Sequence, residues 1–190
     1  MKDQAENLRK MVQQKQNNSN SDRRVDSSQN KDNINSARIY TVTSGKGGVG
    51  KSNFTANLAL ALQEQGQKVI LFDADLGMAN LDVILGVTPN YNLNHVISGK
   101  KTLSEIILEG PNGISLIPGG SGIEELANLS RYQLNNLIDS WSELEEEYDI
   151  ILIDTGAGLS NIVINFILAA DETLVISTSE PTSITDAYGV

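Results

Sequence analysis

The chain of 190 residues contains no cysteine. This absence excludes a disulfide framework, a thiolate metal site and an iron–sulfur cluster built from this chain. The N-terminus lacks the apolar core of a signal peptide, and no stretch approaches the ~18 apolar residues that a membrane span requires. We therefore expect a soluble protein of the cytoplasm.

Basic residues are also scarce, since 14 Lys and Arg face 24 Asp and Glu. The imbalance is uneven: residues 1–36 carry a net charge of +2 and the remainder carries −12. Sequence-independent binding to nucleic acid depends on Lys and Arg neutralising phosphates, so an acidic domain suits it poorly. We expect proteins and small molecules as partners, and no nucleic acid.

The first 36 residues divide into two segments. Residues 13–36 are polar and show no period of 2 or 3.6, which predicts a disordered linker. In residues 1–12, Ala5, Leu8 and Val12 fall at i, i+3 and i+7, which predicts a helix of about three turns. Because so short a helix does not persist alone, we expect it to dock on a partner.

From residue 37 onwards, apolar strands alternate with helices. The strands are expected at 37–43, 68–75, 113–120, 148–154 and 172–178, and the helices at 51–65, 80–86, 102–110, 124–147 and 160–170. This alternation predicts a three-layer α/β fold with a mostly parallel sheet. The first helix is expected to present one apolar stripe, consisting of Phe54, Leu58, Ala61 and Leu62. The chain stops inside another expected helix, so we expect the domain 37–190 to be a fragment truncated at its C-terminus.

The segment SGKGGVGKS joins the first strand to the first helix and fits G-x-x-x-x-G-K-[ST]. In this pattern glycines let backbone N–H groups turn toward a polyphosphate, and the helix adds its positive N-terminal end. Lys51 is expected to reach the β- and γ-phosphates, and Ser52 to bind Mg²⁺. The expected nucleotide-binding residues are Gly45, Lys46, Gly47, Gly48, Val49, Gly50, Lys51, Ser52 and, from a later loop, Gly158.

Carboxylates close two of the buried strands. Asp154 ends one of them and is the expected carboxylate for Mg²⁺, while Gly156 and Gly158 can bring backbone N–H groups near a γ-phosphate. Asp73 and Asp75 end another strand at i and i+2, so both point to one side of it. Either could orient an attacking water, and a solvated strand end is the alternative.

Lys46 is a second lysine in a loop whose cradle position Lys51 already fills. It is either an exposed side chain or a residue that reaches the nucleotide of another subunit. The stretch KGGVGKS resembles the deviant Walker A motif of the MinD/ParA ATPase family. Asp75, within FDADLGMANLD, resembles the water-activating aspartate of that family, and Asp154 its Walker B aspartate.

The resemblance covers about residues 38–190 and implies a P-loop NTPase fold of the SIMIBI class. It implies ATP as the nucleotide, Mg²⁺ as the cofactor and slow hydrolysis, with Asp75, Lys46 and Lys51 as the catalytic residues. It also implies a homodimer that forms with ATP, in which Lys46 contacts the phosphates of the partner. A further implication is ATP-dependent association of the complete protein with the inner face of the cell membrane.

The stretch DQAENLR, residues 3–9, resembles the activator motif of the FlhG branch of this family, which regulates flagellar number and placement. Residues 154–158 and 180–188 resemble the same branch. The resemblance implies that the N-terminal helix stimulates a signal-recognition-type GTPase, FlhF, and that flagellar basal-body proteins are further partners. The matching partner-binding positions are Asp3, Gln4, Ala5, Leu8 and Arg9.

Other interpretations compete with a flagellar regulator. A division-site regulator of the MinD type has the same ATPase but leaves the N-terminal motif unexplained, and the acidic domain argues against a ParA-type DNA-partitioning ATPase. The missing cysteines argue against an Mrp-type iron–sulfur carrier. A nucleotide-dependent adaptor without hydrolysis is a further alternative, and these residues do not distinguish ATP from GTP. We expect His95 and Trp141 to be structural.

Overall fold

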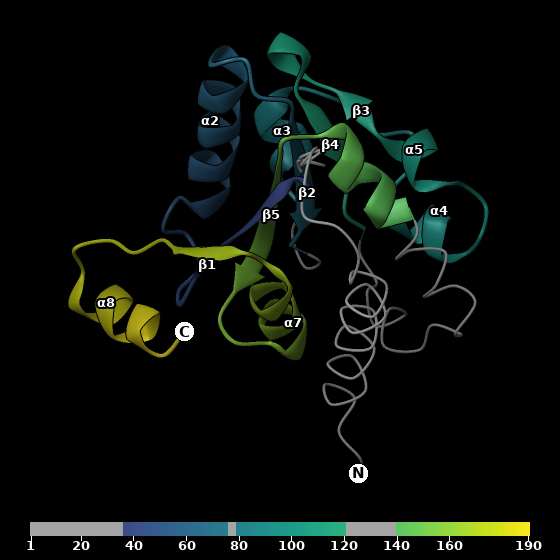
Figure 1. The fold of residues 1–190 in the computed structure, drawn as a ribbon. Helices are drawn as coiled ribbons and strands as arrows, with labels where there is room; N and C mark the ends of the chain where they lie inside the picture. The colour runs from purple at the N-terminus through teal and green to yellow at the C-terminus, as the bar shows by residue number, and fades with distance from the viewer. Residues whose placement is uncertain (1–35, 76–78, 121–139) are drawn as a thin grey trace, which may run out of the picture. The chain divides into compact units, whose positions relative to one another are not determined.

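The computed structural model describes residues 36–75, 79–120 and 140–190, and in this part of the chain the strands form one sheet. The strands are β1 (Arg38–Ser44), β2 (Val69–Ala74), β3 (Leu108–Glu109), β4 (Ser115–Ile117), β5 (Ile150–Ala157) and β6 (Glu172–Val175). Their order is β3-β4-β2-β5-β1-β6, with β3 antiparallel to β4 and all other pairs parallel (Figure 1). The mostly parallel sheet predicted from the sequence is confirmed.

Helices cover both faces of this sheet. The helices of the described ranges are α2 (Lys51–Glu64), α3 (Leu81–Leu85), α4 (Leu93–Ile97), α5 (Leu103–Ile106), α7 (Asn161–Ala169), α8 (Pro181–Tyr188), a short 3₁₀ helix η1 (Pro111–Gly113) and a helical segment at 140–147, of which α8 and η1 lie outside the two covering layers. One apolar cluster joins α2 and α3 to the sheet, and a second joins α4, α5, α7 and segment 140–147 to it. The three-layer α/β architecture is therefore the one expected.

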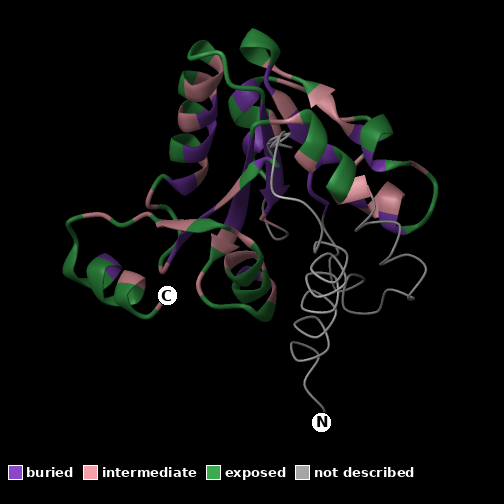
Figure 2. Ribbon diagram, in the orientation of Figure 1, coloured by how far each residue is buried: buried purple, intermediate pink, exposed green. Residues whose placement is uncertain are grey.

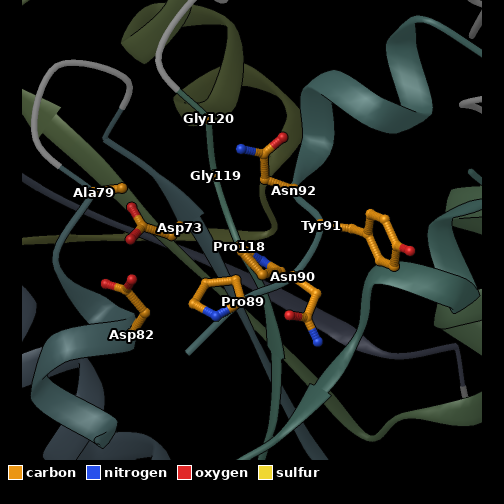
Figure 3. Close-up of a pocket in the computed structure, with 10 residues that line it drawn as sticks. All are labelled: Asp73, Ala79, Asp82, Pro89, Asn90, Tyr91, Asn92, Pro118, Gly119 and Gly120. Atoms are coloured by element: carbon orange, nitrogen blue, oxygen red, sulfur yellow. The ribbon is translucent and has the colours of Figure 1, made fainter. Parts of the chain in front are cut away.

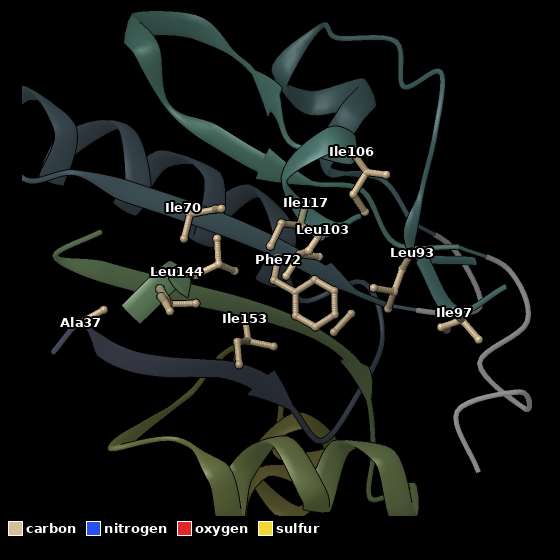
Figure 4. Packing of buried hydrophobic residues seen from close by; sticks show 12 residues of the cluster. Ala37, Ile70, Phe72, Leu93, Ile97, Leu103, Ile106, Ile117, Leu144 and Ile153 are labelled. Carbon is tan, nitrogen blue, oxygen red and sulfur yellow. The ribbon is translucent and has the colours of Figure 1, made fainter. Parts of the chain in front are cut away.

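The alternation of side chains along β2 builds both clusters. Val69 and Leu71 pack toward α2 and α3, whereas Ile70 and Phe72 pack toward the opposite layer. All four are buried, as Figure 2 shows for the central strands and Figure 4 for the packing around Phe72. The Phe72 ring meets Trp141 edge to face with centroids 5.6 Å apart, so Trp141 has the structural role that we expected.

The buried face of α2 differs from the predicted stripe. Phe54 and Ala61 are exposed, and Leu58 and Leu62 are only partly buried. The buried positions are Lys51, Thr55, Ala56 and Ala59. Small side chains on the buried face let the helix lie close to the sheet. The spacing of large apolar residues alone does not show which face of the helix is buried.

The prediction of one helix over residues 102–110 is wrong for the second half of that segment. Only α5 is helical, and β3 follows it and pairs antiparallel with β4. The chain reverses between these strands through Asn112 and Gly113, whose φ values of 56° and 79° are left-handed. Because that turn brings the chain back beside residues 108–109, these residues pair with β4 as a short strand and do not continue the helix.

The helix α4 was not predicted from the sequence. Asn92 precedes it, and its side chain accepts a hydrogen bond from Asn94 N, while His95 Nδ1 accepts one from Asn92 N. His95 is thus part of a helix cap, which is the structural role expected of it.

Several predictions fall on residues outside those that the structure describes. These are the helix at 1–12 with its partner-binding positions, the linker at 13–36 except Ser36, and most of the helix at 124–147. In the described ranges, no helix has both the length and the apolar character needed to cross a bilayer.

Candidate nucleotide-binding site

The glycine-rich loop lies at the carboxyl end of β1, between Ser44 and the start of α2 at Lys51. Gly48 and Gly50 have φ values of 78° and 91°, which residues with a Cβ atom rarely adopt. Gly50 is also the N-cap of α2. The loop therefore leads directly into the N-terminus of a 14-residue helix, where free N–H groups and the helix dipole favour an anion.

Lys51 and Asp154 form a buried ion pair at this point. Lys51 Nζ lies 2.9 Å from Asp154 Oδ1, and the side chains are only 7% and 1% exposed. Thr55 Oγ1 is 3.0 Å from the same carboxylate oxygen. The loop lysine and the strand-end carboxylate, predicted separately from the sequence, are thus in direct contact.

The sheet register places the carboxylates. Asp154 on β5 is paired with Val42 on β1 and with Asp73 on β2, so the ends of three neighbouring parallel strands meet here. Gly158 N, just beyond β5, donates to Ser44 O at 2.8 Å, which ties this loop to the start of the glycine-rich loop. The predicted loop residues 45–52 and Gly158 therefore border the same edge of the sheet.

Asp75 follows β2 and lies beside the end of β5. A Cβ added at Gly156 would be 3.5 Å from Asp75 Oδ1, so the Asp75 carboxylate lies close to the loop that follows Asp154. Asp75 N donates to Asp73 Oδ1 at 3.2 Å. Asp75 therefore lies at the edge of the site, beside the loop that follows Asp154.

Asp73 has a different surrounding from Asp75. Its Oδ2 accepts hydrogen bonds from Asn80 N and Leu81 N, both at 3.1 Å. Burial raises the pKa of Asp73 to about 6, although the N–H donors from Leu81, Asp75 and Asn80 oppose this rise. Asp73 therefore fixes the backbone around Asp75 and at the start of α3.

A cavity of about 270 Å³ lies next to Asp73. The carboxylates of Asp73 and Asp82 line one side, and Asn90, Tyr91 and Asn92 lie across from them (Figure 3). None of the loop residues 45–52 lines it. The cavity is consequently separate from the glycine-rich loop.

Lys46 points away from the Lys51–Asp154 pair. Its Nζ lies 3.1 Å from Glu180 Oε2 and 3.4 Å from Thr182 Oγ1, at the start of α8. The side chains of Lys46 and Glu180 are 44% and 65% exposed. Lys46 thus contacts its own chain here, and it does not join the buried cluster around Asp154.

The donor set fits a magnesium ion bound with a polyphosphate. Ser52 follows the cradle lysine, and Asp154 uses Oδ1 for both of its protein donors. Mg²⁺ keeps several waters and commonly takes one or two protein ligands plus substrate phosphates. The described residues hold no cluster of three or more His, Asp or Glu side chains that would suit a metal.

Sequence reasoning missed two parts of this arrangement. Thr55 touches Asp154, and its spacing of four residues from Lys51 was the available signal, because i and i+4 share a helix face. Glu180 and Thr182 are separated from Lys46 by more than 130 residues, so no local pattern could connect them.

Comparisons with known proteins agree with this geometry. The AAA domain family matches residues 37–187. The antiactivator FleN of Pseudomonas aeruginosa is 46% identical over 153 residues, which are 80% of this chain and 55% of FleN. The flagellum site-determining protein YlxH of Helicobacter pylori is 46% identical over 158 residues, which are 83% of this chain and 53% of YlxH.

A solved structure gives the same result for the fold. The septum site-determining protein MinD of Pyrococcus horikoshii, complexed with Mg-ADP, superposes with a TM-score of 0.67 at 36% identity. The match covers 79% of this chain and 61% of that one. The chain spans about half the length of the curated relatives that it matches. From the strand–loop–helix site, the family match and these identities, the chain belongs to the MinD/ParA family of P-loop ATPases, and FleN and YlxH are among its relatives.

Proposed function

We propose that the complete protein binds MgATP, hydrolyses it slowly and dimerises while ATP is bound. The observation that carries this proposal is the buried contact between Lys51, at the start of α2, and Asp154 on β5. A lysine and a carboxylate that are both buried at a helix N-terminus are costly to keep unless they serve a ligand or each other. A polyphosphate offers the lysine a second partner of higher charge.

In this proposal the residues act as follows. The loop N–H groups and Lys51 bind the phosphates, and Ser52 and Asp154 hold Mg²⁺, which when bound neutralises charge on the phosphate oxygens. Asp75 accepts a hydrogen bond from the attacking water and orients it toward the γ-phosphate. The position of the Asp75 carboxylate beside the loop at Gly156 supports this role.

Lys46 has a separate role, which is to contact the nucleotide of the second subunit. Its direction supports this, because Nζ lies at an exposed ion pair with Glu180 and away from Asp154. The proposal requires Lys46 to exchange Glu180 for a phosphate of the partner. An exposed pair of this kind contributes only ~0–1 kcal/mol, so the exchange is energetically easy.

The biological setting that we propose is the control of flagellar number and placement. The similarity to FleN and YlxH supports it, as does the N-terminal stretch DQAENLR. In this setting residues 1–12 stimulate an FlhF-like GTPase through Asp3, Gln4, Ala5, Leu8 and Arg9. The complete protein is cytoplasmic, and its ATP-bound dimer associates with the inner face of the membrane and with basal-body proteins.

A second candidate is positioning of the division site. The similarity to the MinD of Pyrococcus horikoshii supports it, since the two chains share their fold at 36% sequence identity. This candidate gives no role to the stretch at residues 3–9, so we place it second.

Nucleotide binding is tested by calorimetric titration of the full-length protein with ATP and with GTP, in the presence of Mg²⁺. We expect ATP to bind and Lys51→Ala to abolish binding. Unchanged affinity in Lys51→Ala would contradict the site assignment, and preference for GTP would contradict the assignment of ATP. Phosphate release by the wild type, absent in Asp75→Ala, separates an ATPase from a non-hydrolysing adaptor.

The N-terminal role is tested with a peptide of residues 1–12 added to a purified FlhF-like GTPase. We expect faster phosphate release, and no acceleration by the peptide with Gln4→Ala and Leu8→Ala. If both peptides act equally or neither acts, the flagellar activator role is wrong and division-site positioning becomes the better candidate.

A further inference from the structure

Thr55 lies on the second turn of α2, four residues after Lys51, and its side chain is fully buried. Its hydroxyl is 3.0 Å from Asp154 Oδ1 and 3.0 Å from the backbone oxygen of Lys51. Lys51 Nζ is 2.9 Å from the same Oδ1. One face of α2 therefore directs two donors at a single carboxylate oxygen.

The two donors differ in how firmly they are held. Lys51 has a long side chain with an ammonium group that binds phosphate, and the proposed function requires it to turn toward the nucleotide. Thr55 is β-branched and buried, so its χ1 angle is restricted and its hydroxyl remains where the helix places it. When the Lys51 ammonium group turns from Asp154 to the nucleotide, the Thr55 hydroxyl is the donor that remains hydrogen-bonded to Asp154.

A donor is needed at that moment because Asp154 is 1% exposed. A buried carboxylate without hydrogen bonds is unfavourable, and a carboxylate free to rotate is a poor metal ligand. A hydrogen bond to Oδ1 restrains rotation of the carboxylate, so that Asp154 would be held in place to bind a metal. Hydrogen bonds that orient a metal ligand commonly contribute tenfold or more to metal affinity.

We propose that Thr55 is a positioning residue that holds Asp154 in place for Mg²⁺ after Lys51 has turned to the phosphates. This inference rests on the proposed function, because it presumes that nucleotide draws Lys51 away. The alternative is a purely local role, in which the Thr55 hydroxyl only bonds to the Lys51 carbonyl one turn earlier in the helix.

Three variants of the full-length protein separate these roles. Thr55→Val keeps the shape of the side chain and removes the hydroxyl, whereas Thr55→Ser keeps the hydroxyl. Thr41→Val is the matched control, because Thr41 is an equally buried threonine on the neighbouring strand β1 whose hydroxyl donates to Phe166 O on α7 instead of to Asp154. Where Thr55→Val does not fold, Thr55→Ala serves instead, since it removes the hydroxyl without adding bulk.

The measurement is calorimetric titration with ADP, first in EDTA and then over a range of Mg²⁺ concentrations. ADP avoids the dimer that the proposed function assigns to ATP. In Thr55→Val we expect ADP affinity in EDTA to stay within about twofold of wild type, and the Mg²⁺ concentration for half-maximal enhancement to rise about tenfold. Thr55→Ser is expected to restore most of the Mg²⁺ response, and Thr41→Val to leave it unchanged.

A wild-type Mg²⁺ response in Thr55→Val would overturn the inference. An equal loss of ADP affinity in EDTA and in Mg²⁺ would overturn it too, because that result indicates a local structural role. An equal defect in Thr55→Ser would overturn it as well. The proposed function fails in a different way, namely when the wild-type protein binds no nucleotide or shows no Mg²⁺ dependence.

Discussion

Lys46 in the glycine-rich loop forms an ion pair with Glu180 of its own chain, with Nζ and Oε2 3.1 Å apart. The two residues are 134 positions apart in the sequence and meet because α8 packs against the loop. If Lys46 acts on a second subunit, this contact has to break when the dimer forms.

We therefore expect Glu180→Gln to leave ATP-driven dimerisation intact and to tighten it by at most about thirtyfold. The reason is that an exposed ion pair is worth ~0–1 kcal/mol and a dimer breaks two of them, one in each subunit, which limits how strongly they can oppose the dimer. The dimer dissociation constant in ATP, from sedimentation equilibrium, checks this. A variant that no longer dimerises would indicate that Glu180 contributes to the dimer itself.

The second prediction concerns the cost of breaking the buried pair. Lys51→Met leaves Asp154 buried without its cation, so we expect the free energy of unfolding to fall by about 3–5 kcal/mol without nucleotide. The double variant Lys51→Met, Asp154→Leu removes both charges and is expected to recover most of that loss. Urea unfolding of the three proteins measures it. Equal stability of Lys51→Met and the wild type would contradict a buried pair.

The third prediction uses two glycines of the same loop. A Cβ at Gly45 would lie 2.1 Å from the carbonyl carbon of Asp186 in α8, whereas a Cβ at Gly47 meets nothing within 4 Å. We expect Gly45→Ala to lower the free energy of unfolding by about 1–3 kcal/mol, because α8 has to move, and Gly47→Ala to change it little. Thermal unfolding compares them, and identical melting temperatures would show that α8 does not rest on Gly45.

The fourth prediction concerns pH. Burial raises the pKa of Asp73 from 3.8 to about 6, so the folded state binds a proton more tightly than the unfolded state. The resulting stabilisation is complete below the unfolded pKa and is lost as pH rises through about 6. Relative to Asp73→Asn, the wild type should therefore lose about 1 kcal/mol of unfolding free energy between about pH 5 and pH 7.

Urea unfolding of both proteins at several pH values, without nucleotide or Mg²⁺, gives this difference. Carboxylates far from Asp73 have the same surroundings in both proteins, so the difference reports Asp73 together with its charge interaction with Asp154. A constant difference across the range would mean that Asp73 keeps an ordinary pKa.

Much of the site was predictable because its parts follow local rules. The order of strand, glycine-rich loop and helix fixes where Lys51 lies, and parallel strands bring their carboxyl ends together, which places Asp154 and Asp75 nearby. Both Asp73 and Asp75 alternate to the same side of β2, so the choice of Asp75 rests on the family resemblance. The structure adds that Asp73 Oδ2 accepts hydrogen bonds from Asn80 N and Leu81 N, which no local pattern predicts.

Other features depend on contacts that the sequence does not encode locally. The prediction that α2 buries an apolar stripe containing Phe54 was wrong, because the helix buries small residues such as Ala56 and Ala59 against the sheet. Residues 102–110 contain a strand because the turn at Asn112 returns the chain to β4. The Lys46–Glu180 pair depends on the packing of α8, which is a tertiary event.

The central claim is that ATP joins two copies of the complete protein through Lys46, and multi-angle light scattering of Asp75→Ala tests it most directly. We expect this variant to have the mass of a dimer in MgATP and of a monomer in MgADP, since blocked hydrolysis retains the ATP state. Adding Lys46→Ala is expected to give a monomer that still binds ATP. A monomeric Asp75→Ala in MgATP, or a dimeric double variant, would contradict the account.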